Sequence, residues 1–263
     1  MKNLFLTFLI LLGCAIVLSG QKNFKAEEFT CRDGSILMYQ KMEPRKIKKS
    51  KKYPLVVFLH GAGERGADNK SQLVHGAKLF DDKKNRRKYP AFVLFPQCPS
   101  NEYWAKVDID RSDKEDPFRF DFRDKPNKPL ESVFELIRSY LRLPSVDPDR
   151  VYIMGLSMGG MGTFEAISRH PEWFAAAIPI CGGGDLEFVE SFAQKVPVWV
   201  FHGAKDDVVL PKYSRDIVQE IIFKGGFPRY SEYSEANHNA WDKAFAEKDL
   251  LPWLFHQKKT LTN

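Results

Sequence analysis

The stretch VYIMGLSMGGMG, residues 151–162, places a serine between two glycines. Its first half is apolar and of strand length, and the residues after Ser157 have a helical pattern. Gly155-Leu156-Ser157-Met158-Gly159 matches G-x-S-x-G, in which the serine occupies a strained turn from a strand into a helix. Gly155 and Gly159 suit such a turn, because a side chain at either position would collide with neighbouring backbone. The pattern predicts a nucleophilic Ser157. The alternative is a plain glycine-rich turn.

Apolar runs of strand length recur on both sides of this stretch, and several lack alternation, as in strands covered on both faces. Helical patterns separate the later runs. This alternation predicts an α/β fold with a mostly parallel central sheet and helices on both faces. The strand-like runs are 54–61, 91–99, 150–157, 175–184 and 196–203; helices are expected over 130–141, 159–169, 213–224 and 240–255, the last interrupted by Pro252.

Two further segments stand outside this alternation. The turn Asp33–Gly34 lies between two strand-like runs and predicts an N-terminal hairpin. Residues 108–129 are charged, contain prolines and have no periodicity. We expect them to form a loop over one face, with a plain solvated excursion as the alternative.

Composition and charge are those of a globular protein. The chain has 263 residues, 43% hydrophobic and 28% charged, with a net charge of +6. Lys and Arg concentrate in residues 43–54 and 81–90, and both segments are expected to be solvated loops entering strands. No aromatic interleaving or known module accompanies them, so no nucleic-acid partner is expected.

The N-terminus has the organisation of a secretory signal. Lys2 precedes the apolar run Leu4–Leu18, and small residues 19–20 follow. We expect residues 1–20 to be removed, leaving one catalytic domain over 21–263, secreted or periplasmic and without a transmembrane span. The chain stays apolar after Cys14, which favours a cleaved signal over a lipid anchor at that cysteine. The oligomeric state is left open.

Three cysteines follow the signal segment, so at least one is unpaired in a monomer. Cys98 and Cys181 each end a strand-like run. A bridge between them is conceivable, but buried free thiols are the commoner case. No Cys/His spacing is typical of zinc, and no metal or cofactor is expected.

A nucleophilic serine needs a histidine base and an orienting carboxylate, and in this fold both follow the serine along the chain. His238 lies in the loop SEANHNAWDKAF, after a strand-like run and before the last helix, which is the position expected for the base. His170, His202 and His256 are interpreted as structural or peripheral.

The candidate acids follow the strand-like run 196–203 in the segment FHGAKDDVVLP. Asp206 and Asp207 are both possible from position, and either could instead cap the next turn. Asp185, in GGGDLEF, is a more distant candidate.

Acyl transfer also needs donors for the developing oxyanion. One is expected from the backbone N–H of Met158, directly after the nucleophile. The second is expected from the loop FLHGAGERGADN at Ala62, with Gly61 or Gly63 as alternatives. This loop lacks the phosphate-binding pattern G-x-x-x-x-G-K-[ST], which counts against a nucleotide site.

Four other side chains are candidates for roles near the substrate. Trp104 and Trp241 are candidates for lining an acyl or aromatic pocket, although packing is the usual role of large aromatics. Glu64 and Arg65 follow the oxyanion loop and either brace it through an ion pair or contact substrate.

These motifs occur in an order that resembles secreted bacterial α/β-hydrolases. The similarity covers most of residues 53–253 and points to carboxylesterases, feruloyl esterase-like and polyhydroxybutyrate depolymerase-like enzymes. It implies Asp206 as the triad acid and His238 as the base. Dienelactone hydrolases share the architecture but use cysteine as nucleophile, where this chain has Ser157. Prolyl oligopeptidase-type peptidases share the catalytic half, but 263 residues leave no room for their propeller.

The function implied is ester hydrolysis through a serine acyl-enzyme. The expected partner is a small-molecule or polysaccharide-linked ester, with acetyl or feruloyl esters as family-level substrates. The alternatives are a serine peptidase or thioesterase on the same fold, and a non-catalytic secreted binding protein. The non-catalytic alternative is disfavoured, because the chain has a candidate residue for the nucleophile, the acid, the base and the oxyanion donors.

Overall fold

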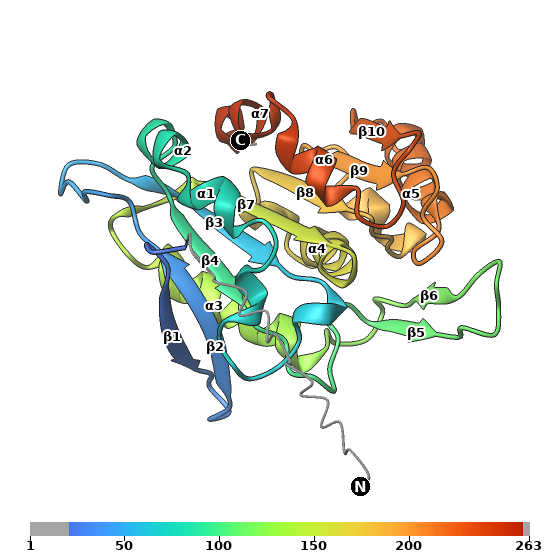
Figure 1. Ribbon diagram of the computed structural model, residues 1–263, viewed down its shortest axis with the longest axis horizontal. Helices are drawn as coiled ribbons and strands as arrows, with labels where there is room; N and C mark the ends of the chain where they lie inside the picture. Colours follow the sequence, from blue (N-terminus) through green and yellow to red (C-terminus); the bar gives the residue numbers. More distant parts are fainter. Residues whose placement is uncertain (1–20, 260–263) are drawn as a thin grey trace, which may run out of the picture.

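The computed structural model describes residues 21–259, and its main element is an eight-stranded sheet (Figure 1). Pairs from β4 to β10 are parallel, whereas β2 pairs antiparallel with both β1 and β4. The strands, in sheet order, are β1 (Lys25–Thr30), β2 (Ile36–Met42), β4 (Phe92–Pro96), β3 (Tyr53–Leu59), β7 (Val146–Leu156), β8 (Ala176–Ile180), β9 (Trp199–Gly203) and β10 (Arg229–Tyr233). The predicted fold class is confirmed. The signal segment predicted over 1–20 lies outside the described residues.

Helices cover both faces of the sheet, because the central strands are apolar on both sides. In β3, Leu55 and Val57 belong to one hydrophobic cluster, and Val56 and Phe58 to another. The first cluster includes residues of α3 (Lys128–Leu141), α4 (Met158–Arg169) and α5 (Pro211–Phe223); the second includes residues of α1 (Ala77–Asp81), α6 (Trp241–Ala246) and α7 (Leu250–His256).

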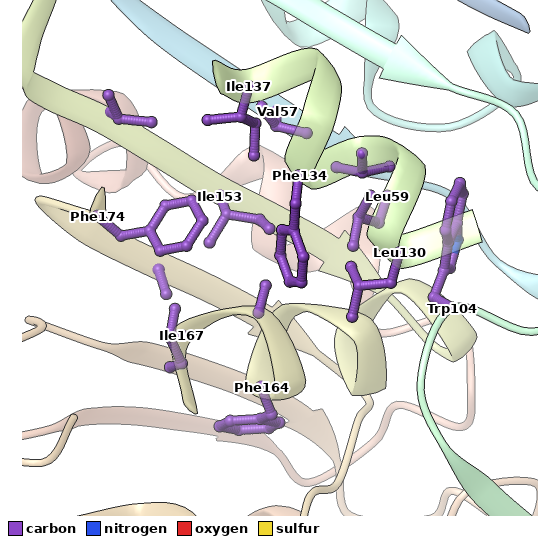
Figure 2. Packing of buried hydrophobic residues seen from close by; sticks show 14 of the residues in the cluster. Val57, Leu59, Trp104, Leu130, Phe134, Ile137, Ile153, Phe164, Ile167 and Phe174 are labelled. Atoms are coloured by element: carbon purple, nitrogen blue, oxygen red, sulfur yellow. The ribbon is translucent and has the colours of Figure 1, made fainter. Parts of the chain in front are cut away.

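The packing of α3 and α4 on the sheet fixes the strand ends that carry the site. Phe134 and Ile137 of α3 lie over β3 and β7, and Ile167 of α4 packs into the same layer (Figure 2). Fully burying each such side chain contributes about 1.5–3 kcal/mol. The junction between β7 and α4, where Ser157 lies, is therefore held by two packed elements.

Two local predictions about helices are wrong. Residues 83–88 of the expected basic loop form helix α2 (Lys83–Lys88), because the Asp82 carboxylate accepts hydrogen bonds from the Lys84 and Asn85 N–H groups and caps it. The last helix breaks at residues 247–249 rather than at Pro252. Pro252 lies in the first turn of α7, where an N–H would have no acceptor within the helix.

Residues 108–129 are more than a loop. Strands β5 (Val107–Ile109) and β6 (Phe118–Phe120) form an antiparallel hairpin. Phe118 is buried against Tyr213 of α5, whose hydroxyl accepts a hydrogen bond from Phe118 N at 2.9 Å. The prediction of a loop missed this because two three-residue strands are too short to show a periodicity.

Other predictions concern turns and thiols. The N-terminal hairpin is confirmed, with Gly34 at φ +84° in its turn. Cys98 and Cys181 are buried free thiols. Within residues 21–259, no helix is both long and apolar enough to cross a bilayer.

Candidate active site

Ser157 lies on a strained elbow between β7 and α4. Its φ of +54° and ψ of −120° are outside the regions that non-glycine residues usually adopt. A Cβ on Gly155 would lie 2.1 Å from the Gly159 carbonyl oxygen, and one on Gly159 would lie 2.0 Å from the Leu59 carbonyl oxygen. The predicted strand–serine–helix turn is therefore confirmed, and both glycines are required by close backbone approach.

The structure brings Ser157, His238 and Asp206 into one hydrogen-bonded chain. His238 Nε2 lies 2.8 Å from Ser157 Oγ, and His238 Nδ1 lies 2.8 Å from Asp206 Oδ2. Because a carboxylate only accepts, the ring hydrogen lies on Nδ1 and Nε2 can accept from the serine hydroxyl. This is the arrangement by which a histidine can take the proton of a serine nucleophile.

Asp206 is buried and held on both of its oxygens. Oδ1 accepts hydrogen bonds from the Val208 and Val209 N–H groups, both at 3.0 Å. Burial alone would raise the pKa of Asp206, but hydrogen bonds from His202 and His238 outweigh it and hold that pKa well below its usual value. The group opposite His238 is therefore a carboxylate.

The competing acids lie elsewhere. Asp207 is exposed, whereas Asp206 is buried beside His238. Asp185 accepts hydrogen bonds from Glu187 N and Phe122 N and caps a short 3₁₀ helix, η4 (Leu186–Ser191). The structure therefore selects Asp206 by position.

His202 was interpreted as turn packing, and its position beside the acid was missed. Its Nε2 lies 3.2 Å from Asp206 Oδ2 and 2.8 Å from the Val209 carbonyl oxygen. Both neighbours are acceptors, so Nε2 carries a hydrogen. His202 Nδ1 lies 2.7 Å from Ser214 Oγ, which in turn lies 2.9 Å from the Gly182 carbonyl oxygen. His202 lies in β9 and Asp206 in the loop after it, so their contact depends on how that loop turns and no spacing in the sequence indicated it.

His60 orients the oxyanion loop through hydrogen bonds of its ring. His60 Nε2 accepts from the Cys98 N–H at 2.9 Å, so the ring hydrogen is on Nδ1 and donates to the Gly61 carbonyl at 2.6 Å. In a trans peptide the C=O and N–H point in opposite directions. The Ala62 N–H therefore points away from His60. Burial lowers the pKa of His60 to about 4, which keeps the ring neutral near pH 7.

The two predicted oxyanion donors lie close to the nucleophile. A Cβ on Gly61 would be 3.7 Å from Ser157 Cβ, which places the loop against the elbow. Ala62 begins the 3₁₀ helix η1 (Ala62–Glu64) and Met158 begins α4, so neither N–H has an acceptor within its own helix. Arg65 Nε donates to the Ala62 carbonyl at 3.0 Å. Arg65 thus braces the loop through a backbone hydrogen bond.

Comparison with known proteins assigns the chain to a protein family. Residues 93–249 match the model of the dienelactone hydrolase family, which is more than half of the chain. The chain belongs to the dienelactone hydrolase family. This family member carries a serine at the nucleophile position, with the triad geometry given above.

Solved structures and curated relatives agree with this assignment. The crystal structure of a thermostable esterase is 40% identical with a TM-score of 0.81, covering 90% of this chain and 64% of that one. Poly(3-hydroxyalkanoate) depolymerase C of Paucimonas lemoignei is 28% identical over 218 residues, 69% of this chain and 47% of the relative. The bifunctional acetylxylan esterase/xylanase XynS20E of Neocallimastix patriciarum is 34% identical over 82 residues, 31% of this chain and 12% of the relative. The chain thus spans less than two thirds of each.

In this dienelactone hydrolase-family chain, a cavity of about 320 Å³ opens beside Ser157 and His238. Its aromatic wall consists of Tyr103, Phe118 and Trp241, and its polar groups are Glu64, His75 and Arg111. Phe118 and Arg111 come from the β5–β6 hairpin, whose contribution the sequence pattern did not predict. Arg111 donates to the Val208 carbonyl at 2.8 Å and lies over the Phe118 ring.

The predicted pocket residues divide into two groups. Trp241 and Glu64 line the cavity, and the Trp241 ring lies edge-on to His238 at 5.2 Å between centroids. Trp104 does not line it, so its prediction as a pocket residue is wrong. It is fully buried, and its indole N–H donates to the His60 carbonyl at 3.0 Å. Trp104 therefore supports the backbone of the oxyanion loop.

Cys181, His202 and Asp206 are ligand types for a metal, and their ligand atoms lie within 4.8 Å of one another. Those ligand atoms already make contacts within the triad or with residues beside it. Cys181 Sγ lies 3.3 Å from the His238 carbonyl oxygen, and burial raises the pKa of this thiol, so it is protonated. His202 and Asp206 are committed to each other. The cluster is therefore explained as support for His238.

Proposed function

We propose that this protein is a carboxylic-ester hydrolase that acts through a serine acyl-enzyme. The observation that carries the proposal is the hydrogen-bonded chain from Asp206 through His238 to Ser157, with both links at 2.8 Å. The 40% identity to a thermostable esterase supports ester bonds over other acyl bonds.

The reaction begins when Ser157 Oγ bonds to the ester carbonyl carbon and its proton passes to His238 Nε2. The carbonyl electron pair moves to the oxygen, which the N–H groups of Ala62 and Met158 stabilise. Losing one such donor typically costs about 3–4 kcal/mol in the transition state. The bond to the alcohol oxygen then breaks, and that oxygen takes the proton from His238.

A water molecule completes the cycle. His238 Nε2 takes a proton from the water as its oxygen bonds to the acyl carbon. The second tetrahedral intermediate collapses, Ser157 Oγ recovers the proton, and the acid leaves. Throughout, the Asp206 carboxylate holds the ring by its Nδ1 hydrogen and stabilises the imidazolium.

For the substrate, we propose acetyl or feruloyl esters linked to polysaccharide. The name of the acetylxylan esterase relative supports a sugar ester, although that similarity covers 31% of this chain. The aromatic wall of Tyr103, Phe118 and Trp241 favours an aromatic acyl group such as feruloyl over acetyl. A panel of acetyl, butyryl and feruloyl sugar esters should show the highest kcat/KM for the feruloyl ester.

We propose a secreted or periplasmic location from the residue pattern of 1–20. N-terminal sequencing of the mature protein from the culture medium or periplasm should begin near residue 21. A mature chain that starts at a lipid-modified Cys14 would replace this proposal by membrane anchoring.

The direct test of the enzymatic role uses Ser157→Ala with p-nitrophenyl acetate. Activity should fall to the background rate, while the control Ser139→Ala, in the last turn of α3 and outside the cavity beside Ser157, should keep it. Peptide-nitroanilide and acyl-thioester substrates belong in the same assay. Faster cleavage of either than of any ester would replace the proposal with a peptidase or a thioesterase.

A further inference from the structure

Positive charge is concentrated in two short segments of the chain. Residues 45–52 and 83–88 hold eleven of the 40 Lys and Arg residues and no Asp or Glu. The rest of the chain then has 29 basic and 34 acidic residues, so it carries net negative charge despite the overall +6. We call the surface formed by these two segments the basic surface.

The sheet topology brings the two segments together. One precedes β3 and the other precedes β4, and these strands pair in parallel, with Leu55 opposite Phe92. Segments that enter adjacent parallel strands meet at the amino end of the sheet. Both line one cavity of about 550 Å³, through Lys51, Lys52 and Lys88. In Figure 1 the loop before β3 and helix α2 lie at the same end of the molecule.

The charges of the basic surface are unpaired. Ten of its eleven cations are exposed, and Arg86 is half-buried. Within residues 21–259 none of the eleven forms an ion pair, whereas many other cations of the chain do, such as Lys41 with Glu27. Like charges held close together repel one another, so a bound anionic surface would lower their energy.

The geometry favours a lipid surface as the partner. The loop before β3 projects from the body of the molecule (Figure 1), and Ile47, at its centre, is 44% exposed among six cations. An apolar residue flanked by lysines suits insertion among anionic headgroups. Recognition of a polysaccharide would call for an exposed aromatic platform, but Tyr53 and Tyr89 beside these segments are buried and half-buried.

We propose that the basic surface docks the protein on an anionic phospholipid membrane. Ser157 follows the carboxyl end of β7, and the basic surface lies at the amino ends of β3 and β4. A molecule docked through the basic surface therefore keeps its triad directed away from the lipid. This inference goes beyond the proposed esterase activity and stands without it.

Vesicle sedimentation tests the docking directly. The full chain should sediment with vesicles of phosphatidylcholine and phosphatidylglycerol in equal parts at low salt, and remain in solution with pure phosphatidylcholine. Binding should weaken steeply as salt rises, because the Debye length falls to about 3 Å at 1 M. Equal sedimentation with both vesicle types, or with neither, would overturn the proposal. Binding to dextran sulfate without binding to vesicles would instead indicate a polyanionic chain as partner.

Matched variants locate the contact. Replacing four cations of the loop by glutamine should weaken binding to the mixed vesicles by about tenfold or more. A control with four exposed cations replaced elsewhere should bind like the unmodified chain. The first set is Lys48, Lys49, Lys51 and Lys52; the control set is Lys114, Lys125, Lys195 and Lys243. Equal weakening by both sets would show a non-specific charge effect and refute the basic surface.

Two further readouts separate insertion and orientation. Ile47→Ser should weaken binding to the mixed vesicles several-fold, because it removes an apolar contact. The same fold-change should be measured at low and at high salt. Vesicle-bound protein should hydrolyse soluble p-nitrophenyl acetate as fast as free protein. Inhibition on docking would contradict the orientation. Sedimentation needs no activity, so a failure of the esterase proposal would leave the docking result intact.

Discussion

Two histidines donate to one carboxylate in this site. Asp206 Oδ2 lies 2.8 Å from His238 Nδ1 and 3.2 Å from His202 Nε2, while Oδ1 accepts two backbone N–H groups. The carboxylate therefore has one orientation available. This constraint, more than its charge alone, separates Asp206 from the adjacent Asp207.

Asparagine substitutions at these neighbouring positions should have very different effects. Asp206→Asn should lower kcat by about 10⁴-fold, because the amide no longer enforces the His238 tautomer. Asp207→Asn should change kcat by less than about twofold, because its side chain is exposed. Steady-state kinetics with p-nitrophenyl acetate would decide, and the reverse ranking would move the acid by one residue.

His202 acts through Asp206 as a positioning residue. His202→Gln should lower kcat by about 10- to 100-fold with little change in KM, because the acid loses a fixed donor while the substrate cavity is untouched. Ser214→Ala, which removes only the hydroxyl beside His202 Nδ1, should give a smaller loss in the same direction. A rise in KM with constant kcat in either variant would contradict the positioning role. Thermal denaturation controls for folding.

A site residue could be predicted from the sequence where the chemistry of serine catalysis limits which residue type can fill its position. Ser157 and His238 follow from a motif and a chain order that serine catalysis requires. Asp206 needed family resemblance, because two adjacent aspartates on a loop look equivalent until the backbone turns one inward. Trp104 was unpredictable for the same reason: a tryptophan near a site packs inward or outward according to backbone direction.

At the scale of elements, the oxyanion loop depends on a neutral His60. Below its folded pKa of about 4 the ring becomes charged while buried. Its pKa is depressed relative to about 6.5 in the unfolded chain, so it contributes stability above pH 6.5 that is lost as pH falls toward 4.

The His60 contribution can be measured by substitution. Between pH 7 and 4, the unfolding free energy of the unmodified protein should fall by up to about 3 kcal/mol more than that of His60→Asn, which cannot gain the proton. Denaturant unfolding at each pH gives both curves. Parallel curves would show that His60 does not couple folding to protons in this range.

The β5–β6 hairpin supplies one wall of the cavity. Arg111→Ala should raise KM for a feruloyl ester by about 3- to 10-fold and leave p-nitrophenyl acetate nearly unchanged, because the small acyl group does not reach this wall. Lys114→Ala, on the same hairpin but not lining the cavity, is the matched control. Equal effects of the two variants on the feruloyl ester would remove Arg111 from substrate recognition.

Helices and strands could be predicted from the sequence where they are long enough to show a periodic pattern of apolar residues. The central strands β3, β4, β7, β8 and β9 and the helices α3, α4 and α5 follow from apolar patterns that the core then buries. Helix α2 was missed because its six residues are polar and depend on one capping carboxylate. The β5–β6 hairpin was missed because its three-residue strands show no periodicity, and it packs on Tyr213 of α5, 95 positions from Phe118.

At the scale of the whole molecule, the triad and the basic surface lie at opposite ends of the parallel strands. Carboxyl ends of strands carry the triad, as open α/β sheets generally do. The amino ends of β3 and β4 carry the basic surface. The sequence showed both basic segments but not their meeting, because the neighbouring positions of β3 and β4 are a property of strand order.

The central claim is that Ser157 is an activated nucleophile in an assembled triad. A fluorophosphonate probe, followed by peptide mapping, tests it without knowledge of the substrate. We expect a single adduct on Ser157 and much slower labelling of the folded His238→Ala variant. An adduct on another serine, or no adduct on folded protein, would contradict it.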